Sequence, residues 1–222
     1  MGDRDYYLLD DENTVKIRDA YKVYVNRLFT LAGYSAEEAA EAAKTVIDLE
    51  TEIAKVSVDR ATRRDVHKNY NKMTVKEFTS RFDFIDWEVF FKETGICKSE
   101  ELNASQVTFF EGLTKLLKNV SLEDQKDYLA FKLLNSAANY LSDDFVNASF
   151  DFYGKALQGK EENQPRWKSS LAVVNRSLAE AFGQMYVEKY FPASSKEKML
   201  EMVANLQTAL GERIDALEWM SD

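Results

Sequence analysis

Residues 164–168 read Gln-Pro-Arg-Trp-Lys and open a long segment that ends at residues 190–192, Tyr-Phe-Pro. Proline suits the first position of a helix, because its missing N–H would have no partner there. Apolar residues then recur at helical spacing: Leu171, Val174, Leu178, Ala181, Phe182, Met185 and Tyr186. Pro192 ends the run, because proline does not continue a helix. The segment therefore predicts one amphipathic helix from Pro165 to about residue 190.

Similar start signals predict helices along most of the chain, which has only two prolines and eight glycines in 222 residues. The predicted helices cover residues 13–32, 35–53 with a capping box at Ser35 and Glu38, a short helix capped by Thr74, residues 86–93, 121–141, 143–159 and 194–217. A short strand is expected at residues 106–110. Residues 121–141 are apolar nearly all round, which predicts a helix buried in the core. The fold class is therefore all-α, a multi-helix array with a buried central helix and at most one short β element.

No low-complexity linker divides the chain, so one helical domain over residues 3–222 is predicted. Residues 217–220 lead into Ser221 and Asp222, which suit the start of a further helix. Met1 and Gly2 look like a cloning start, although a natural start is the simpler alternative.

Charge and hydropathy exclude several classes of protein. The net charge of −9 argues against nonspecific nucleic-acid binding, where neutralisation of phosphates dominates affinity. No apolar run approaches the roughly 18 residues of a membrane span, and the N-terminus has no signal-peptide pattern. One basic stretch departs from the acidic average: Arg60, Arg63, Arg64, Lys68, Lys72 and Lys76. It is interpreted as a solvated or interdomain face, with an acidic partner as the alternative.

The sequence lacks the residues for metal or nucleophilic catalysis. A protein zinc site takes three or four His, Cys or carboxylate ligands, whereas this chain has one histidine, His67, and one cysteine, Cys97. Nothing near these two residues suggests an orienting carboxylate, so a nucleophile pair is not expected. Asp48 and Glu52 share one helical face and are interpreted as solvated surface. No catalytic residue and no metal ligand is therefore predicted in this chain.

Five separate stretches resemble neprilysin-type zinc endopeptidases, in the order in which that family carries them. They are Asp3–Tyr7, Tyr70–Thr74, Phe150–Tyr153, Arg166–Lys168 and Leu217–Met220. The resemblance covers essentially the whole chain, although the chain is only a minority of a full family enzyme.

The resemblance implies a non-catalytic helical domain that faces a thermolysin-like catalytic domain of the same polypeptide. In the family the two domains enclose a cavity that admits peptides and excludes folded proteins. The zinc ligands, the catalytic glutamate and the Asn-Ala motif lie in later sequence, so zinc belongs to the intact parent enzyme and not to this chain. Leu9, Tyr21 and Ser170 stand where animal members carry cysteines, which suggests a disulfide-free bacterial branch. The resemblance also implies an extracytoplasmic parent enzyme.

Two functions follow for the residues singled out. In the first, the chain caps the active-site cavity and restricts substrates to peptides. The candidate cavity or interdomain residues are then Arg4, Arg60, Arg63, Arg64, Arg166 and Trp167, of which the last two are expected chiefly to hold helices together. In the second, the chain is a free-standing helical module that binds a partner protein or peptide without peptidase activity.

Overall fold

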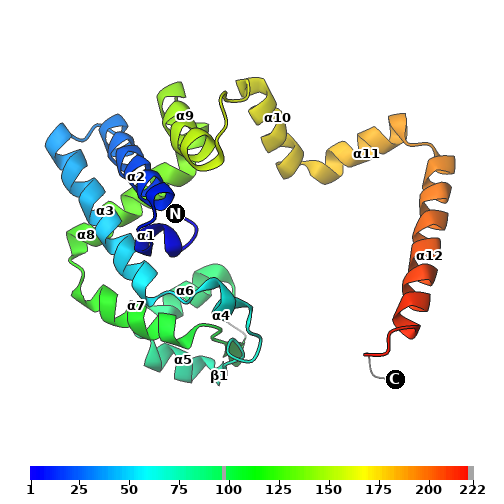
Figure 1. Cartoon of the computed structure of the whole chain (residues 1–222), viewed down its shortest axis with the longest axis horizontal. Coiled ribbons are helices and arrows are strands. Elements are labelled where there is room, and N and C mark those ends of the chain that lie inside the picture. The colour runs from blue at the N-terminus through cyan, green and yellow to red at the C-terminus, as the bar shows by residue number, and fades with distance from the viewer. Residues whose placement is uncertain (97–98, 220–222) are drawn as a thin grey trace. The chain divides into compact units, whose positions relative to one another are not determined.

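The structure is a computed structural model that describes residues 1–96 and 99–219, and most of these residues are helical (Figure 1). The predicted all-α class is confirmed. The described chain divides into two compact units, Met1–Asn163 and Gln164–Asp222, and each is considered by itself. A single domain over residues 3–222 stays a prediction. Cys97 and the expected cap at Ser221 and Asp222 lie outside the described residues.

The first unit is organised around two helices, α2 (Glu12–Leu31) and α3 (Ala36–Val56), which lie side by side in Figure 1. Asp11 caps α2 by accepting a hydrogen bond from the Thr14 amide. Gly33, with a φ of 97°, lets the chain reverse between the two helices. Ser35 and Glu38 form the predicted capping box of α3. The sequence therefore located both helices to within one residue at their starts.

An aromatic core fills the space between α2, α3 and the segments that pack on them. These segments are α1 (Asp5–Leu8), α8 (Leu122–Ala137), the 3₁₀ turn Ala138–Tyr140, α9 (Asp143–Ser149) and the π-helical segment Phe150–Ala156. Phe152 stacks on Tyr24 with ring centroids 5.4 Å apart and lies 5.0 Å from the ring of Tyr21. Phe145, Tyr153 and Leu157 also pack against this core.

The prediction that residues 121–141 form a helix buried all round is wrong. Phe131 of α8 is fully buried, but Leu129 and Leu133 are 65% and 69% exposed. The reason is that α8 packs on the core through one face only. The central position belongs to α3, which contacts α1, α2, α7 and α8.

A smaller aromatic cluster lies in the same unit, among short elements. They are β1 (Lys72–Thr74), α5 (Val75–Arg81), α6 (Trp87–Thr94), β2 (Glu101–Asn103) and α7 (Val107–Asn119). The short helix α4 (Arg60–Arg64) precedes them in the chain. The two strands pair antiparallel, with Met73 opposite Leu102. The predicted cap at Thr74 is confirmed, and Asp86, the predicted first residue of the next short helix, is its N-cap. Phe78, Phe82 and Ala104 are the buried centre of this cluster.

The strand predicted at residues 106–110 is wrong, because these residues begin α7. Four apolar or β-branched residues in a row resemble a strand, but the apolar face continues at helical spacing beyond residue 110. Gly112 brings α7 close to α3, since a Cβ at this position would lie only 2.5 Å from the Cβ of Val56. The contact between the two helices therefore depends on the absence of a side chain.

The second unit consists of α10 (Arg166–Ser177), α11 (Ala179–Tyr190) and α12 (Ala193–Asp215). The predicted continuous helix is wrong, because it breaks at Leu178, whose φ of −124° and ψ of 26° are not helical. Neither proline nor glycine marks this break. Pro192, not Ser194, is the N-cap of α12. No described residue of these three helices is buried.

Candidate functional site

Two of the arginines singled out in the sequence converge on one carboxylate of the first unit. Arg60 and Arg63 of α4 contact Oδ2 of Asp3 at 2.5 and 3.0 Å. Asp3 is only 8% exposed, so the two cations neutralise a buried charge. The hydrogen bond from Arg60, together with the backbone amide of Asp5, lowers the pKa of Asp3.

Arg4 contributes to the same region through a different contact. Its Nη1 donates to the carbonyl oxygen of Ser57, the C-cap residue of α3, at 2.5 Å. Arg64 is exposed and forms no ion pair within residues 1–96 and 99–219. The N-terminal segment is thereby tied to the end of α3 and to α4. The role of these arginines at a cavity or domain seam stays a prediction.

A polar pocket of about 400 Å³ lies beside these contacts. Asp3, Arg4 and Arg63 line one part of it, and Tyr128 and Lys132 of α8 line another. Further lining residues come from the end of α3 and from the start of α7. The structure therefore brings residues from four separated stretches of sequence to one charged hollow.

Glu50 is the residue of this pocket that sequence reasoning missed. Its side chain is 7% exposed, and its Oε2 accepts hydrogen bonds from the hydroxyls of Tyr7 at 2.7 Å and Tyr21 at 2.8 Å. The ammonium group of Met1 lies 3.7 Å from the same oxygen. The sequence does contain a sign of this buried carboxylate. Glu50 lies on the apolar face of its helix with Val46 and Ile47, where a charged residue is rare unless it is paired.

The tyrosines around Glu50 are held in the neutral, hydrogen-bond-donating form. Burial, and then the negative charge of Glu50, raises the pKa of Tyr7 and Tyr21. The same two causes raise the pKa of Tyr128 to about 12. The hydroxyls of Tyr7 and Tyr21 therefore stay protonated and donate to Glu50, and they do not suit general-base chemistry.

The remaining candidates, Arg166 and Trp167, belong to the second unit. Trp167 is 64% exposed, and the ammonium group of Lys168 lies 5.5 Å from the centre of its ring. Arg166 is the first residue of α10.

The described residues do not suit a zinc site. His67 is exposed, and no group of three or more His, Cys, Asp or Glu side chains in residues 1–96 and 99–219 is arranged to hold a metal ion. Asp48 and Glu52 pair with Lys44 and Lys55 on the solvated face of α3, which confirms their interpretation as surface residues.

The first unit thus combines a helical array with a charged hollow that is lined from four separated stretches of sequence. The family model described as "Peptidase family M13" matches residues 1–222, so the chain belongs to this family as the N-terminal helical region of neprilysin-type metallopeptidases. Among the described residues, none of the helices has the length and the apolar composition that a membrane span requires.

Relatives from animals and bacteria agree with this assignment. Membrane metallo-endopeptidase-like 1 of Mus musculus is 27% identical over all of this chain and 31% of its own length. The endothelin-converting enzyme homolog of Locusta migratoria is 30% identical over 98% of this chain and 31% of its own length. This chain therefore spans about a third of the relatives it matches.

Solved structures show the same helical array in bacterial proteins. Zinc metalloprotease Zmp1 of Mycobacterium tuberculosis, in complex with an inhibitor, matches all of this chain and 33% of its own with a TM-score of 0.86 and 28% identity. PepO of Lactobacillus rhamnosis matches 99% of this chain and 35% of its own with a TM-score of 0.75 at 18% identity, which supports the fold alone. These neighbours are consistent with the predicted bacterial branch.

Proposed function

We propose that this chain is the helical region that caps the active-site cavity of a larger, zinc-dependent peptidase and restricts its substrates to peptides. One observation supports the proposal: the family match extends over all 222 residues, yet no group of side chains in residues 1–96 and 99–219 is arranged to hold a metal ion. The reaction would then belong to a catalytic domain elsewhere in the same polypeptide, and zinc to that domain.

The first unit has the properties that a cap needs. Its aromatic core and the Asp3 contacts with Arg60 and Arg63 hold the N-terminal segment and α4 on the helical array. A rigid wall of this kind would limit substrate size and exclude water when the cavity closes. Within this proposal Arg4, Arg63 and Lys132 would present positive charge to the carbonyl or carboxylate oxygens of a peptide.

The second unit has properties that suit a domain seam. Trp167, Leu206 and Leu210 are each more than half exposed, and contiguous apolar faces mark surfaces that other protein covers. Arg166 and Trp167 would lie at this seam. By analogy with relatives named as membrane metallo-endopeptidases, the parent enzyme would act outside the cytoplasm.

A length series of substrates in the intact parent enzyme tests the cap. We expect turnover of unstructured peptides to fall steeply with length and to vanish for a folded protein of the same local sequence. Equal turnover of a decapeptide and a folded protein would contradict the size restriction.

The chain by itself provides the matching control. Residues 1–222 with added zinc should not hydrolyse the same peptides above the rate of buffer. Turnover that persists through purification and stops with a chelator would contradict the non-catalytic assignment.

A further inference from the structure

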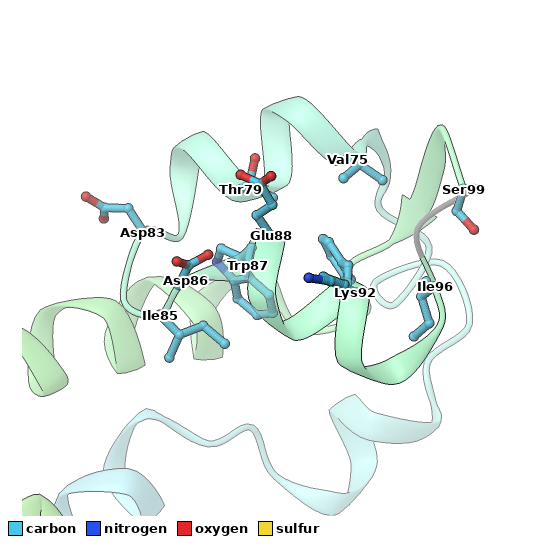
Figure 2. A pocket seen from close by; sticks show the side chains of 11 residues that line it. Val75, Thr79, Asp83, Ile85, Asp86, Trp87, Glu88, Lys92, Ile96 and Ser99 are labelled. Atoms are coloured by element: carbon cyan, nitrogen blue, oxygen red, sulfur yellow. The ribbon is translucent and has the colours of Figure 1, made fainter.

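A second hollow, of about 640 Å³, lies among the small helices α5 and α6 (Figure 2), and it shares no lining residue with the charged pocket. Ile85, Trp87, Phe91 and Ile96 supply most of its apolar wall. Its volume lies within the range of small-ligand sites, about 300–1,000 Å³. Neither the arginines discussed above nor Glu50 lines it, so it is a separate feature of the first unit.

Trp87 is fixed in this wall before any ligand arrives. Its indole Nε1 donates to the carbonyl oxygen of Phe82 at 2.5 Å. Its ring packs edge-on against Phe78 at 4.8 Å and stacks near Phe91 at 5.7 Å between centroids. A ring held in this way presents a flat apolar face without further loss of side-chain entropy.

The charges around Trp87 are predominantly negative. Figure 2 shows Asp83, Asp86 and Glu88 gathered toward the Trp87 end of the hollow, with Lys92 between them and Ile96. Asp83 is paired with Lys118 at 2.7 Å, and Asp86 accepts from the Val89 amide as the N-cap of α6.

Glu88 and Lys92 differ from these two aspartates. Within the part of the chain that the structure describes, neither forms an ion pair, although they stand four residues apart on α6. Because Lys118 neutralises Asp83, two carboxylates, Asp86 and Glu88, remain against the ammonium group of Lys92. The rim therefore keeps a net negative charge, and the whole chain carries −9.

We propose that this hollow binds a peptide segment in which an apolar side chain is flanked by Arg or Lys. The apolar side chain would lie on Trp87 and Phe91 and leave water. The flanking cation would face Glu88 and Asp86, where charge complementarity selects against acidic segments, and the indole face adds a cation–π contribution. This binding does not depend on the proposed cap function, because it needs only the described residues of the first unit.

Trp87 fluorescence tests the proposal in the full chain. Trp167→Phe and Trp219→Phe, both at exposed positions, leave Trp87 as the single indole. The probe is acetyl-Arg-Leu-Arg-amide, and we expect a saturable change that weakens with added salt. Acetyl-Arg-Gly-Arg-amide should bind about tenfold more weakly, because it buries no leucine. Equal binding of acetyl-Glu-Leu-Glu-amide or of the glycine peptide would overturn the proposal.

A matched pair of substitutions on α6 separates the hollow from the general acidity of the chain. Glu88→Gln removes a rim charge, and we expect the dissociation constant to rise about two- to fivefold. Glu93→Gln removes the same charge from the same helix outside the hollow and should leave the dissociation constant unchanged. Both positions are exposed, so far-UV circular dichroism should be unaltered. Equal effects of the two substitutions, or none from Glu88→Gln, would contradict a specific site.

Discussion

The two units contain helices of similar amphipathic pattern, but only the first unit buries them. In α2, Tyr21, Val25 and Leu28 are at most 1% exposed. In α12, the stripe at Val203, Leu206 and Leu210 is 43–61% exposed. An amphipathic pattern predicts that a helix has an apolar face. It does not predict which part of the protein, if any, covers that face. The contrast makes the second unit the place to look for an interface.

The largest expected effect on the free energy of unfolding comes from truncating a buried apolar residue, with an exposed apolar residue as the comparison. Phe131→Ala removes a fully buried ring, and we expect the free energy of unfolding to fall by about 3–5 kcal/mol. Leu206→Ala in α12 should change it by less than about 0.5 kcal/mol, because Leu206 is 61% exposed. Urea unfolding followed by circular dichroism measures both. A large loss from Leu206→Ala would show that the second unit is packed in solution.

The next effect concerns the buried carboxylate of the first unit. Glu50→Ala leaves the hydroxyls of Tyr7 and Tyr21 without their acceptor, and we expect a loss of about 2–3 kcal/mol in unfolding free energy. Glu52→Ala, two residues away, removes only a surface pair with Lys55 and serves as the control. If the two substitutions cost the same in urea unfolding, the Glu50 contacts contribute little to stability.

A smaller effect depends on pH. The pKa of Asp3 is lowered by its hydrogen bond from Arg60, so its contribution is present above the unfolded pKa of about 4 and is lost as pH falls through the folded value. Asp3→Asn should cost about 1 kcal/mol at pH 7, since Arg60 is 65% exposed, and progressively less toward pH 3. Glu201→Gln on exposed α12 should not alter this pH dependence. A constant cost of Asp3→Asn across this range would contradict the assignment.

The smallest effect on stability is expected for substitutions on the exposed face of α12, which also test whether the chain associates with itself. Leu206→Lys with Leu210→Lys should leave the unfolding free energy within about 0.5 kcal/mol. The same change should reduce self-association of the chain, because it interrupts the apolar face of α12. Light scattering with size-exclusion chromatography measures the mass. A stable monomer before and after substitution would instead favour the free-standing interaction module.

Local chemistry made much of the first unit predictable. The caps at Ser35, Thr74 and Asp86 lie beside the helices they start, and each satisfies a backbone N–H within its own turn. Signals of this kind need no knowledge of the rest of the fold. The one-residue difference at Pro165, which is an N-cap and not the first helical residue, is within the usual uncertainty of helix ends.

The errors arose where distant contacts decide the structure. Leu129 and Leu133 look as apolar as Phe131 in sequence, but only Phe131 lies in the core, where its ring packs near Tyr21 and Phe29 of α2. The hydroxyls of Tyr7 and Tyr21 reach Glu50 across 43 and 29 residues of chain, so no local window contains that cluster. The contacts of Arg60 and Arg63 with Asp3 also join residues that are far apart in the sequence. The function could be predicted only from the family resemblance, because the residues by themselves exclude classes of chemistry and do not indicate one.

The π-helical segment Phe150–Ala156 restricts how the length of this chain can vary in evolution. Its wider turn holds one residue more than an α-helix would, and Phe152 and Tyr153 both contact Tyr24 from it. A Cβ at Gly154 would overlap the ring of Phe150. Deletion of one residue here would rotate every later side chain of the helix by about 100°. Homologues that keep this core should therefore carry neither a gap nor a larger residue at this turn.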